Sequence, residues 1–160
     1  MIALRTILWT VVVGGTATVL LPYWVLSHSG GASIWPEGLA QALGAIPVVA
    51  GAGLYAWCAW AFTVVGKGTP NPLDAPRELV VTGPYLYVRN PIYVAVLLIL
   101  LGEAGWFGSI ELLSIAAAAL VAFHLFVVIY EEPTLARSFG DSYQQYCRTV
   151  HRWLPRPRAK

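Results

Sequence analysis

Long apolar runs, separated by short polar connections, dominate the pattern of this chain. A helix needs about 20 apolar residues to cross the hydrocarbon core of a membrane. Four runs reach or approach that length, at residues 4–26, 40–65, 91–107 and 109–130. We therefore predict an all-α integral membrane protein with about four transmembrane helices. Residues 1–160 would form a single membrane domain, with a polar loop at 66–90 and a polar tail at 131–160.

Composition supports this fold class. Of the 160 residues, 58% are hydrophobic and only 11% are charged, whereas soluble domains carry about 25% charged residues. A nucleic-acid-binding protein needs a basic face on a soluble scaffold, so we predict no nucleic-acid partner. The two cysteines, Cys58 and Cys147, form neither a disulfide framework nor a metal-binding motif, and we predict no metal site.

The basic residues predict the orientation. Arg5 lies at the start of the first run. Lys67, Arg77 and Arg89 lie between the second and third runs, and the others follow the fourth. With four spans, all ten basic residues fall on one side of the membrane. The positive-inside rule then places both termini, the 66–90 loop and any site built from them in the cytoplasm.

Three further patterns refine the prediction. The second run contains small residues, Gly44, Gly51 and Gly53, which allow another helix to pack closely against it. Gly102, Glu103 and Gly105 near the end of the third run suggest a tight turn. In the tail, a helically spaced stripe predicts two short helices along the cytoplasmic interface, interrupted by Gly140. The stripe consists of Leu135, Phe139, Tyr143, Tyr146 and Val150.

Two polar clusters carry the candidate chemistry. The segment Gly83–Tyr93, which includes Arg89 and Asn90, leads into the third run, and Glu131-Glu132 closes the fourth. Adjacent carboxylates repel each other unless a cation lies beside them. Candidate cations are Arg89, Arg137 and Lys67. Asn90 either caps the helix that Pro91 begins or contacts a ligand.

Ionisable groups inside apolar runs are also functional candidates. His124 lies seven residues before Glu131, so the two share nearly one helix face, about 10 Å apart along the axis. Glu103 lies near the external end of the third run, where its carboxylate can reach water.

The sequences Gly-Pro-Tyr, Arg-Asn-Pro-Ile-Tyr and Glu-Glu-Pro resemble a known membrane enzyme group over roughly residues 66–154. This is the isoprenylcysteine carboxyl methyltransferase and phospholipid N-methyltransferase family. The family usually has His where this chain has Asn90, and an amide cannot act as a cation or a proton shuttle. The resemblance implies S-adenosylmethionine as methyl donor.

The resemblance and the residue chemistry together assign the site. Carboxylates suit the amino group and ribose hydroxyls of the donor, and an arginine suits its carboxylate. The cofactor-binding residues are then Tyr85, Tyr87, Arg89, Asn90, Pro91, Tyr93, Glu131 and Glu132. The catalytic residues are Glu132, Arg137 and His124.

The methyl acceptor is expected to be lipophilic, and membrane lipids are the expected surroundings. An isoprenylcysteine-like carboxylate would be positioned by Arg137, and a phospholipid-like amine would need His124 or a glutamate as base. Two other functions remain open: an NADPH-dependent membrane reductase and a non-enzymatic membrane scaffold. The sequence leaves the oligomeric state open.

Overall fold

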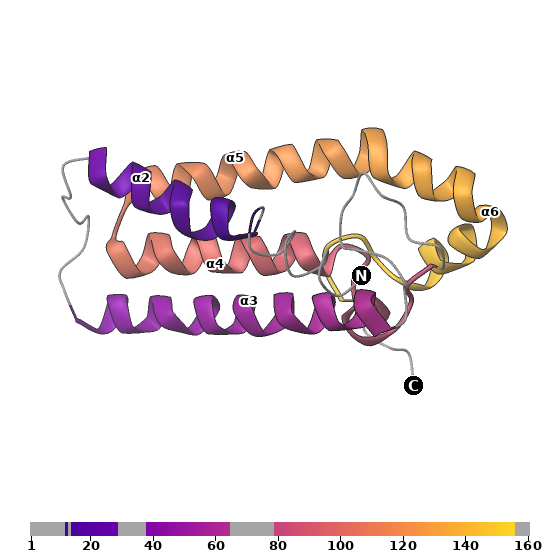
Figure 1. Ribbon diagram of the computed structural model, residues 1–160, viewed down its shortest axis with the longest axis horizontal. Helices are drawn as coiled ribbons and strands as arrows, with labels where there is room; N and C mark the ends of the chain where they lie inside the picture. The colour runs from indigo at the N-terminus through magenta and orange to yellow at the C-terminus, as the bar shows by residue number, and fades with distance from the viewer. Residues whose placement is uncertain (1–11, 13, 29–37, 65–78, 156–160) are drawn as a thin grey trace.

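The structure is a computed structural model that describes residues 12, 14–28, 38–64 and 79–155. All regular secondary structure in these residues is helical. Three helices lie side by side along the long axis of the molecule: α3, α4 and α5 (Figure 1). In chain order the elements are η2 (Thr16–Leu20), α2 (Leu21–His28), α3 (Leu39–Val64), η3 (Gly83–Leu86), α4 (Pro91–Phe107), α5 (Ile110–Phe126), η4 (Val127–Glu131) and α6 (Glu132–Thr149).

Two helical stretches are long and apolar enough to cross a membrane, Gln41–Ala61 and Ile110–Thr149, and Pro91–Phe107 is a shorter apolar helix. Large apolar side chains on their outer faces, such as those of Ile46, Val49 and Ile129, are exposed. Soluble monomers rarely expose contiguous apolar surface on this scale. The helices therefore fit a membrane protein.

The helix bounds follow the apolar runs closely. The runs at 40–65 and 91–107 correspond to α3 and α4, and the run at 109–130 corresponds to α5 with η4. Much of the first run lies outside the described residues, as do Arg5, Lys67 and Arg77. Four membrane crossings with cytoplasmic termini stay a prediction.

Glycines bring the backbones of α3 and α4 into contact. A Cβ atom on Gly44 would lie 2.7 Å from the carbonyl oxygen of Gly102, and one on Gly51 would lie 2.6 Å from that of Ala95. Both distances are too short for any side chain. Without a hydrophobic driving force between helices in lipid, this close packing is what holds them together. Gly53 faces open space and takes no part in the contact.

The turn between α4 and α5 comes later than the sequence pattern indicated. The helix continues through Gly102, Glu103 and Gly105 and ends at Gly108, which adopts a left-handed conformation with φ 61°. Ser109 then caps α5, because its side-chain oxygen accepts a hydrogen bond from the backbone N–H of Leu112 at 3.2 Å.

The chain reverses direction within α6 at Gly140, where the sequence predicts an interruption. This residue has φ 53° and ψ −126°, a conformation that glycine adopts at little cost. The two halves of α6 fold back on each other at one end of the molecule (Figure 1). The predicted stripe packs inward. Tyr143, Tyr146 and Val150 are buried and pack with Leu79, Leu135 and Phe139 in a small core of their own.

Candidate active site

Glu132, the first residue of α6, is held by two arginines. The Arg152 guanidinium donates two hydrogen bonds to its carboxylate, Nε to Oε1 and Nη2 to Oε2, both at 2.8 Å. The Arg89 Nη2 atom lies 3.2 Å from Oε1. The side chains of Arg89, Glu132 and Arg152 are 12%, 20% and 31% exposed. Paired hydrogen bonds of this geometry are among the stronger ion contacts in proteins, and they raise the pKa of Arg152.

Arg89 comes from the segment just before α4 and is nearly enclosed. Its Nη1 atom contacts the sulfur of Cys147, and its backbone N–H donates to the carbonyl oxygen of His151 at 2.9 Å. Its Nε atom is buried and has no hydrogen-bond partner among the described residues. A buried donor without an acceptor is costly, so this atom marks a place where a further acceptor would be stabilising.

Residues 150–153 lie across the segment before α4, and we call them the tail strap. Val88 and His151 form an isolated parallel β-bridge. Asn90 stands at the N-cap of α4 but makes no capping hydrogen bond with its side chain. Its Nδ2 atom instead donates to the carbonyl oxygen of Arg152 at 3.2 Å. Asn90, which is 6% exposed, therefore holds the strap in place.

Glu131 belongs to a second, less polar cluster. The Tyr93 hydroxyl donates to Glu131 Oε2 at 2.7 Å. The Tyr93 ring lies 4.8 Å from that of Phe123 and 6.4 Å from that of Trp153, between centroids. The adjacent glutamates thus have different partners, a neutral phenol for Glu131 and two cations for Glu132, which relieves their mutual repulsion.

His124 joins this cluster from the outer side of α5. The indole Nε1 atom of Trp153 lies 3.2 Å from His124 Nδ1, and the two ring centroids are 6.2 Å apart. His124 itself is exposed.

The structure brings some predicted residues together and leaves others out. Arg137 is exposed and donates to the carbonyl oxygen of Pro133 at 3.2 Å. No hydrogen bond or ion pair joins Arg137 to Glu132 among the described residues, and its role in the site stays a prediction. Its place beside Glu132 is taken by Arg152, fifteen residues further on.

The aromatic residues of the Gly83–Tyr93 segment also differ in position. Tyr87 is half exposed. Tyr85 is buried, and its carbonyl oxygen accepts a hydrogen bond from the Tyr146 hydroxyl at 2.7 Å. Burial raises the pKa of the Tyr85 phenol well above its usual value. Pro91 is fully buried at the start of α4. Tyr85 and Pro91 are buried, and the Tyr93 hydroxyl is bonded to the carboxylate of Glu131.

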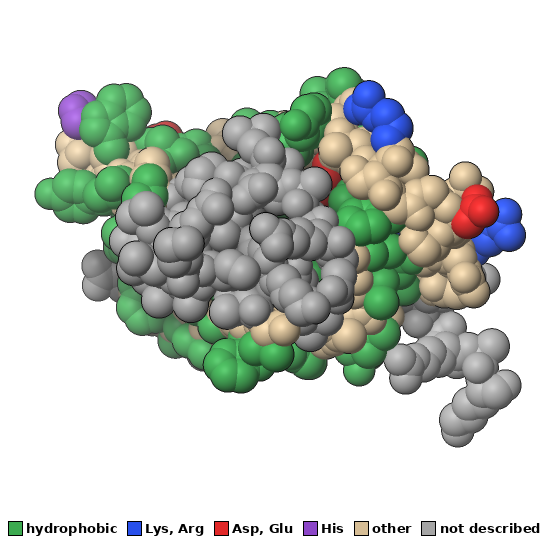
Figure 2. All heavy atoms as spheres, turned by 45° about the vertical axis from the view of Figure 1, so that its right-hand side comes forward, with side chains coloured by type: hydrophobic (Ala, Val, Ile, Leu, Met, Phe, Trp, Pro, Cys, Tyr) green, Lys and Arg blue, Asp and Glu red, His purple; other side chains and the backbone are tan. Residues whose placement is uncertain are grey.

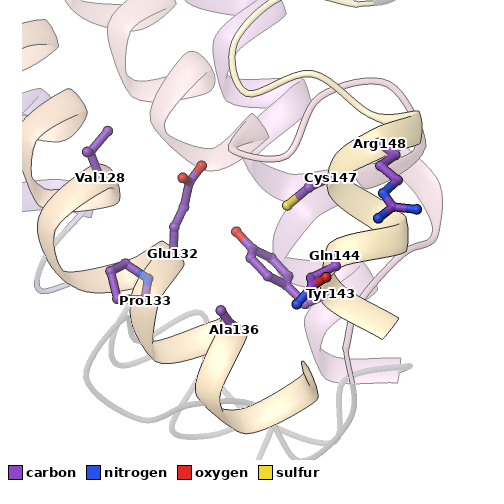
Figure 3. Close-up of a pocket in the computed structure, with 8 residues that line it drawn as sticks. All are labelled: Val128, Glu132, Pro133, Ala136, Tyr143, Gln144, Cys147 and Arg148. Carbon is purple, nitrogen blue, oxygen red and sulfur yellow. The ribbon is translucent and has the colours of Figure 1, made fainter. Parts of the chain in front are cut away.

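A pocket of about 480 Å³ lies between the two halves of α6, with Glu132 in its wall (Figure 3). Figure 3 shows the Glu132 carboxylate and the Tyr143 hydroxyl directed into the space between the two helical segments. Small-molecule pockets usually measure about 300–1,000 Å³. The lining residues are Val128, Glu132, Pro133, Ala136, Tyr143, Gln144, Cys147 and Arg148.

The residues of the pocket fit a polar ligand of nucleoside size. Glu132 supplies carboxylate oxygens, Tyr143 a hydroxyl and Gln144 an amide, which are suitable partners for ribose hydroxyls and an amino group. The unpartnered Nε atom of Arg89 adds a donor for a carboxylate nearby. Basic side chains gather toward this end on the face shown in Figure 2, whereas hydrophobic side chains cover much of the described remainder.

Sequence reasoning missed Arg152, Trp153, Cys147 and Tyr143 as site residues. No local pattern distinguishes Arg152 from the other basic residues of the tail. Tyr143 was visible only as a member of the apolar stripe. No local pattern around Trp153 distinguishes it from the other tryptophans of the chain.

Comparison with known protein families matches residues 39–142 to the phospholipid methyltransferase family. The chain belongs to that family. The matched region contains Arg89, Tyr93, Glu131 and Glu132 and stops before the tail strap. It supports a membrane methyltransferase.

Two curated relatives cover most of this chain. The nickel-cobalt-cadmium resistance protein NccN of Alcaligenes xylosoxydans xylosoxydans is 28% identical over 93% of the chain and 63% of its own length. The cobalt-zinc-cadmium resistance protein CzcN of Cupriavidus metallidurans is 29% identical over 92% of the chain and 62% of its own length. An uncharacterized protein of Haemophilus influenzae is 39% identical over 39% of the chain. The chain thus spans under two thirds of the first two relatives.

Proposed function

We propose that this protein transfers a methyl group from S-adenosylmethionine to a lipophilic acceptor at the membrane boundary. The observation that carries the proposal is the position of Glu132. It lies at the end of a long apolar helix, is fixed by Arg89 and Arg152, and forms part of a pocket of about 480 Å³. Membership of the phospholipid methyltransferase family supports the reaction class.

The pocket between the halves of α6 is the proposed cofactor site. When bound, S-adenosylmethionine supplies an electrophilic methyl group on a sulfonium. Glu132, Tyr143 and Gln144 would accept hydrogen bonds from its ribose or amino groups, and Arg89 would attract its carboxylate. The two arginines hold the Glu132 carboxylate in one orientation, so little reorganisation is needed on binding.

The chain's own contribution to catalysis is to position the reactants and exclude water. Holding two reactants in line converts a bimolecular step into one that is effectively unimolecular. The cluster of Tyr93, Phe123 and Trp153 lies beside Glu131 and would exclude water from the reacting groups. The exposed apolar face of α5 would receive the hydrophobic part of the acceptor.

The proposed location is cytoplasmic, because in the sequence the basic residues fall in the loop before α4 and in the tail after α5, the side that the positive-inside rule assigns to the cytoplasm. The acceptor is either a carboxylate carried by an isoprenylcysteine-like lipid or the amine of a phospholipid-like molecule.

Calorimetric titration of detergent-purified protein with S-adenosylhomocysteine tests the cofactor. We expect wild type to bind and Glu132→Gln to lose at least about tenfold in affinity, since a charged hydrogen-bond partner contributes about 1.5–3 kcal/mol. Glu111→Gln is the matched control, because Glu111 is an exposed acid at the other end of α5. Gel filtration verifies that each variant stays folded.

Incorporation of a labelled methyl group into the chloroform-soluble fraction of a membrane extract tests the acceptor. Label that stays only in water-soluble products would contradict a lipophilic acceptor. A wild-type protein that binds NADPH but not S-adenosylhomocysteine would overturn the proposal in favour of a reductase. Binding of neither would favour the scaffold.

A further inference from the structure

The contact between Trp153 and His124 determines which hydrogen-bonding group the histidine offers. An indole N–H can only donate a hydrogen bond. With Trp153 Nε1 at 3.2 Å from His124 Nδ1, Nδ1 must therefore be the acceptor and carry no proton. A neutral imidazole has one proton, which then lies on Nε2.

We propose that Trp153 is a positioning residue that fixes His124 as the Nε2–H tautomer, so that His124 presents a hydrogen-bond donor to the methyl acceptor. The part that concerns the acceptor rests on the proposed function. In this state neither ring nitrogen has a free lone pair. His124 therefore does not remove a proton, which differs from its sequence-based assignment as a general base.

The indole is held firmly enough to impose this tautomer. The preceding residue, Arg152, donates two hydrogen bonds to Glu132, and its carbonyl oxygen accepts one from Asn90. The Trp153 ring also packs against Tyr93, whose hydroxyl is bonded to Glu131. The charged groups that these contacts link to the pair are Glu131, Glu132 and Arg152, each engaged by a partner of its own.

The surface around the His124 ring limits which molecules can accept a hydrogen bond from its Nε2–H group. The imidazole is exposed, and the neighbouring side chains on α5 that are also exposed are apolar: Leu120, Val121 and Leu125. A molecule that approaches Nε2 along this face therefore has an apolar body. It must also bring an atom with a lone pair, as a carboxylate, phosphate or carbonyl oxygen does. An amine acceptor would have to lose its proton to another group.

Nitrogen-15 NMR of the histidine side chain tests the tautomer directly. The chain has three histidines, so His28→Gln and His151→Gln leave His124 as the sole signal. In this background we expect the Nε2–H form to dominate at neutral pH. Trp153→Phe, which keeps an aromatic ring but removes the donor, should give a mixture of both tautomers. An Nδ1–H form in the parent protein, or an unchanged spectrum in Trp153→Phe, would overturn the proposal.

Methyl transfer by three His124 variants tests the role. The amide N–H₂ of Gln occupies the place of Nε2–H but takes up no proton, so His124→Gln should keep activity within about threefold of wild type. His124→Ala, which loses the hydrogen bond, should lose about tenfold, corresponding to about 1.4 kcal/mol. His124→Asn, with its amide nearer the backbone, should resemble Ala.

If His124→Gln and His124→Ala lost methyl-transfer activity equally and severely, the histidine would work as a base, contrary to the proposal. Binding of S-adenosylhomocysteine should be the same in all three variants. If the wild-type protein transfers no methyl group, the proposed function fails, whereas the NMR measurement still decides the tautomer.

Discussion

Arg152 donates to both carboxylate oxygens of Glu132, with both N–O distances at 2.8 Å. The two residues belong to different parts of the chain, the first turn of α6 and the tail strap. Their contact closes the site around Arg89, and it makes the strap a part of the site.

Replacing Arg152 should weaken both the fold and the cofactor site. We expect Arg152→Ala to destabilise the protein by about 1–2 kcal/mol, because the pair is doubly hydrogen-bonded but partly exposed. Affinity for S-adenosylhomocysteine should fall about tenfold as Glu132 loses its orientation. Arg152→Lys should restore little, since an ammonium cannot make the paired contact. Arg137→Ala is the control, and an equal loss there would contradict the assignment.

Asn90 should control how firmly the tail strap is attached. Asn90→Ala leaves the Arg152 carbonyl oxygen without its donor, at a cost of about 1–3 kcal/mol. Trypsin should then cut after Arg148 and Arg152 faster than in wild type, as mass spectrometry of timed digests would show. Asn90→His, which restores a side-chain donor, should slow the cleavage again. A change at the exposed Gln145 to Ala should leave the rate as it is in wild type.

The glycine contact between α3 and α4 predicts a contrast between two substitutions in one helix. The Cβ of Gly44→Ala would meet the backbone of Gly102 at 2.7 Å, so the helices must separate, at about 1–3 kcal/mol. Gly53→Ala meets nothing within 4 Å and should be neutral or slightly stabilising, because alanine favours helix. Thermal unfolding in detergent measures both. Similar melting temperatures would show that the two helices do not pack at Gly44.

The buried phenol of Tyr85 predicts sensitivity to alkali. Its pKa is raised in the folded protein, so the folded state holds its proton more tightly than the unfolded state. This contribution to stability is complete below the unfolded pKa of about 10 and is lost as the pH rises above it. Stability of wild type measured from pH 8 to 11 should therefore fall at the alkaline end. The stability of Tyr85→Phe should fall less over the same pH range. If stability fell equally steeply with pH in both proteins, the result would contradict a buried neutral phenol at Tyr85.

The sequence predicted those features of the fold that depend on residues close together in the chain. The apolar runs determine α3 and α4 because each is bounded by polar or turn-forming residues, and Pro91 marks the first residue of α4. Arg89 and Glu132 could be paired because they lie at the same end of neighbouring helices. Gly140 was visible as a break in the tail.

The path of the chain after that break could not be inferred. The backbone torsions of Gly140 direct the second half of α6 back over the first, and this reversal brings Arg152 to Glu132 and Trp153 to His124. From the sequence, Arg137 is the arginine nearest to Glu132 along the chain, and nothing local points to Arg152. The hydrogen bond of Asn90 was missed likewise, because its acceptor is the carbonyl oxygen of a residue 62 positions away.

The tail strap also has a consequence for biosynthesis. A ribosome releases α3, α4 and α5 before residues 150–153 emerge. At that point Glu132 still lacks Arg152, and His124 still lacks Trp153. Completion of the site therefore depends on residues made after α3, α4 and α5, and a chain interrupted before residues 150–153 would have these helices but an unfinished site.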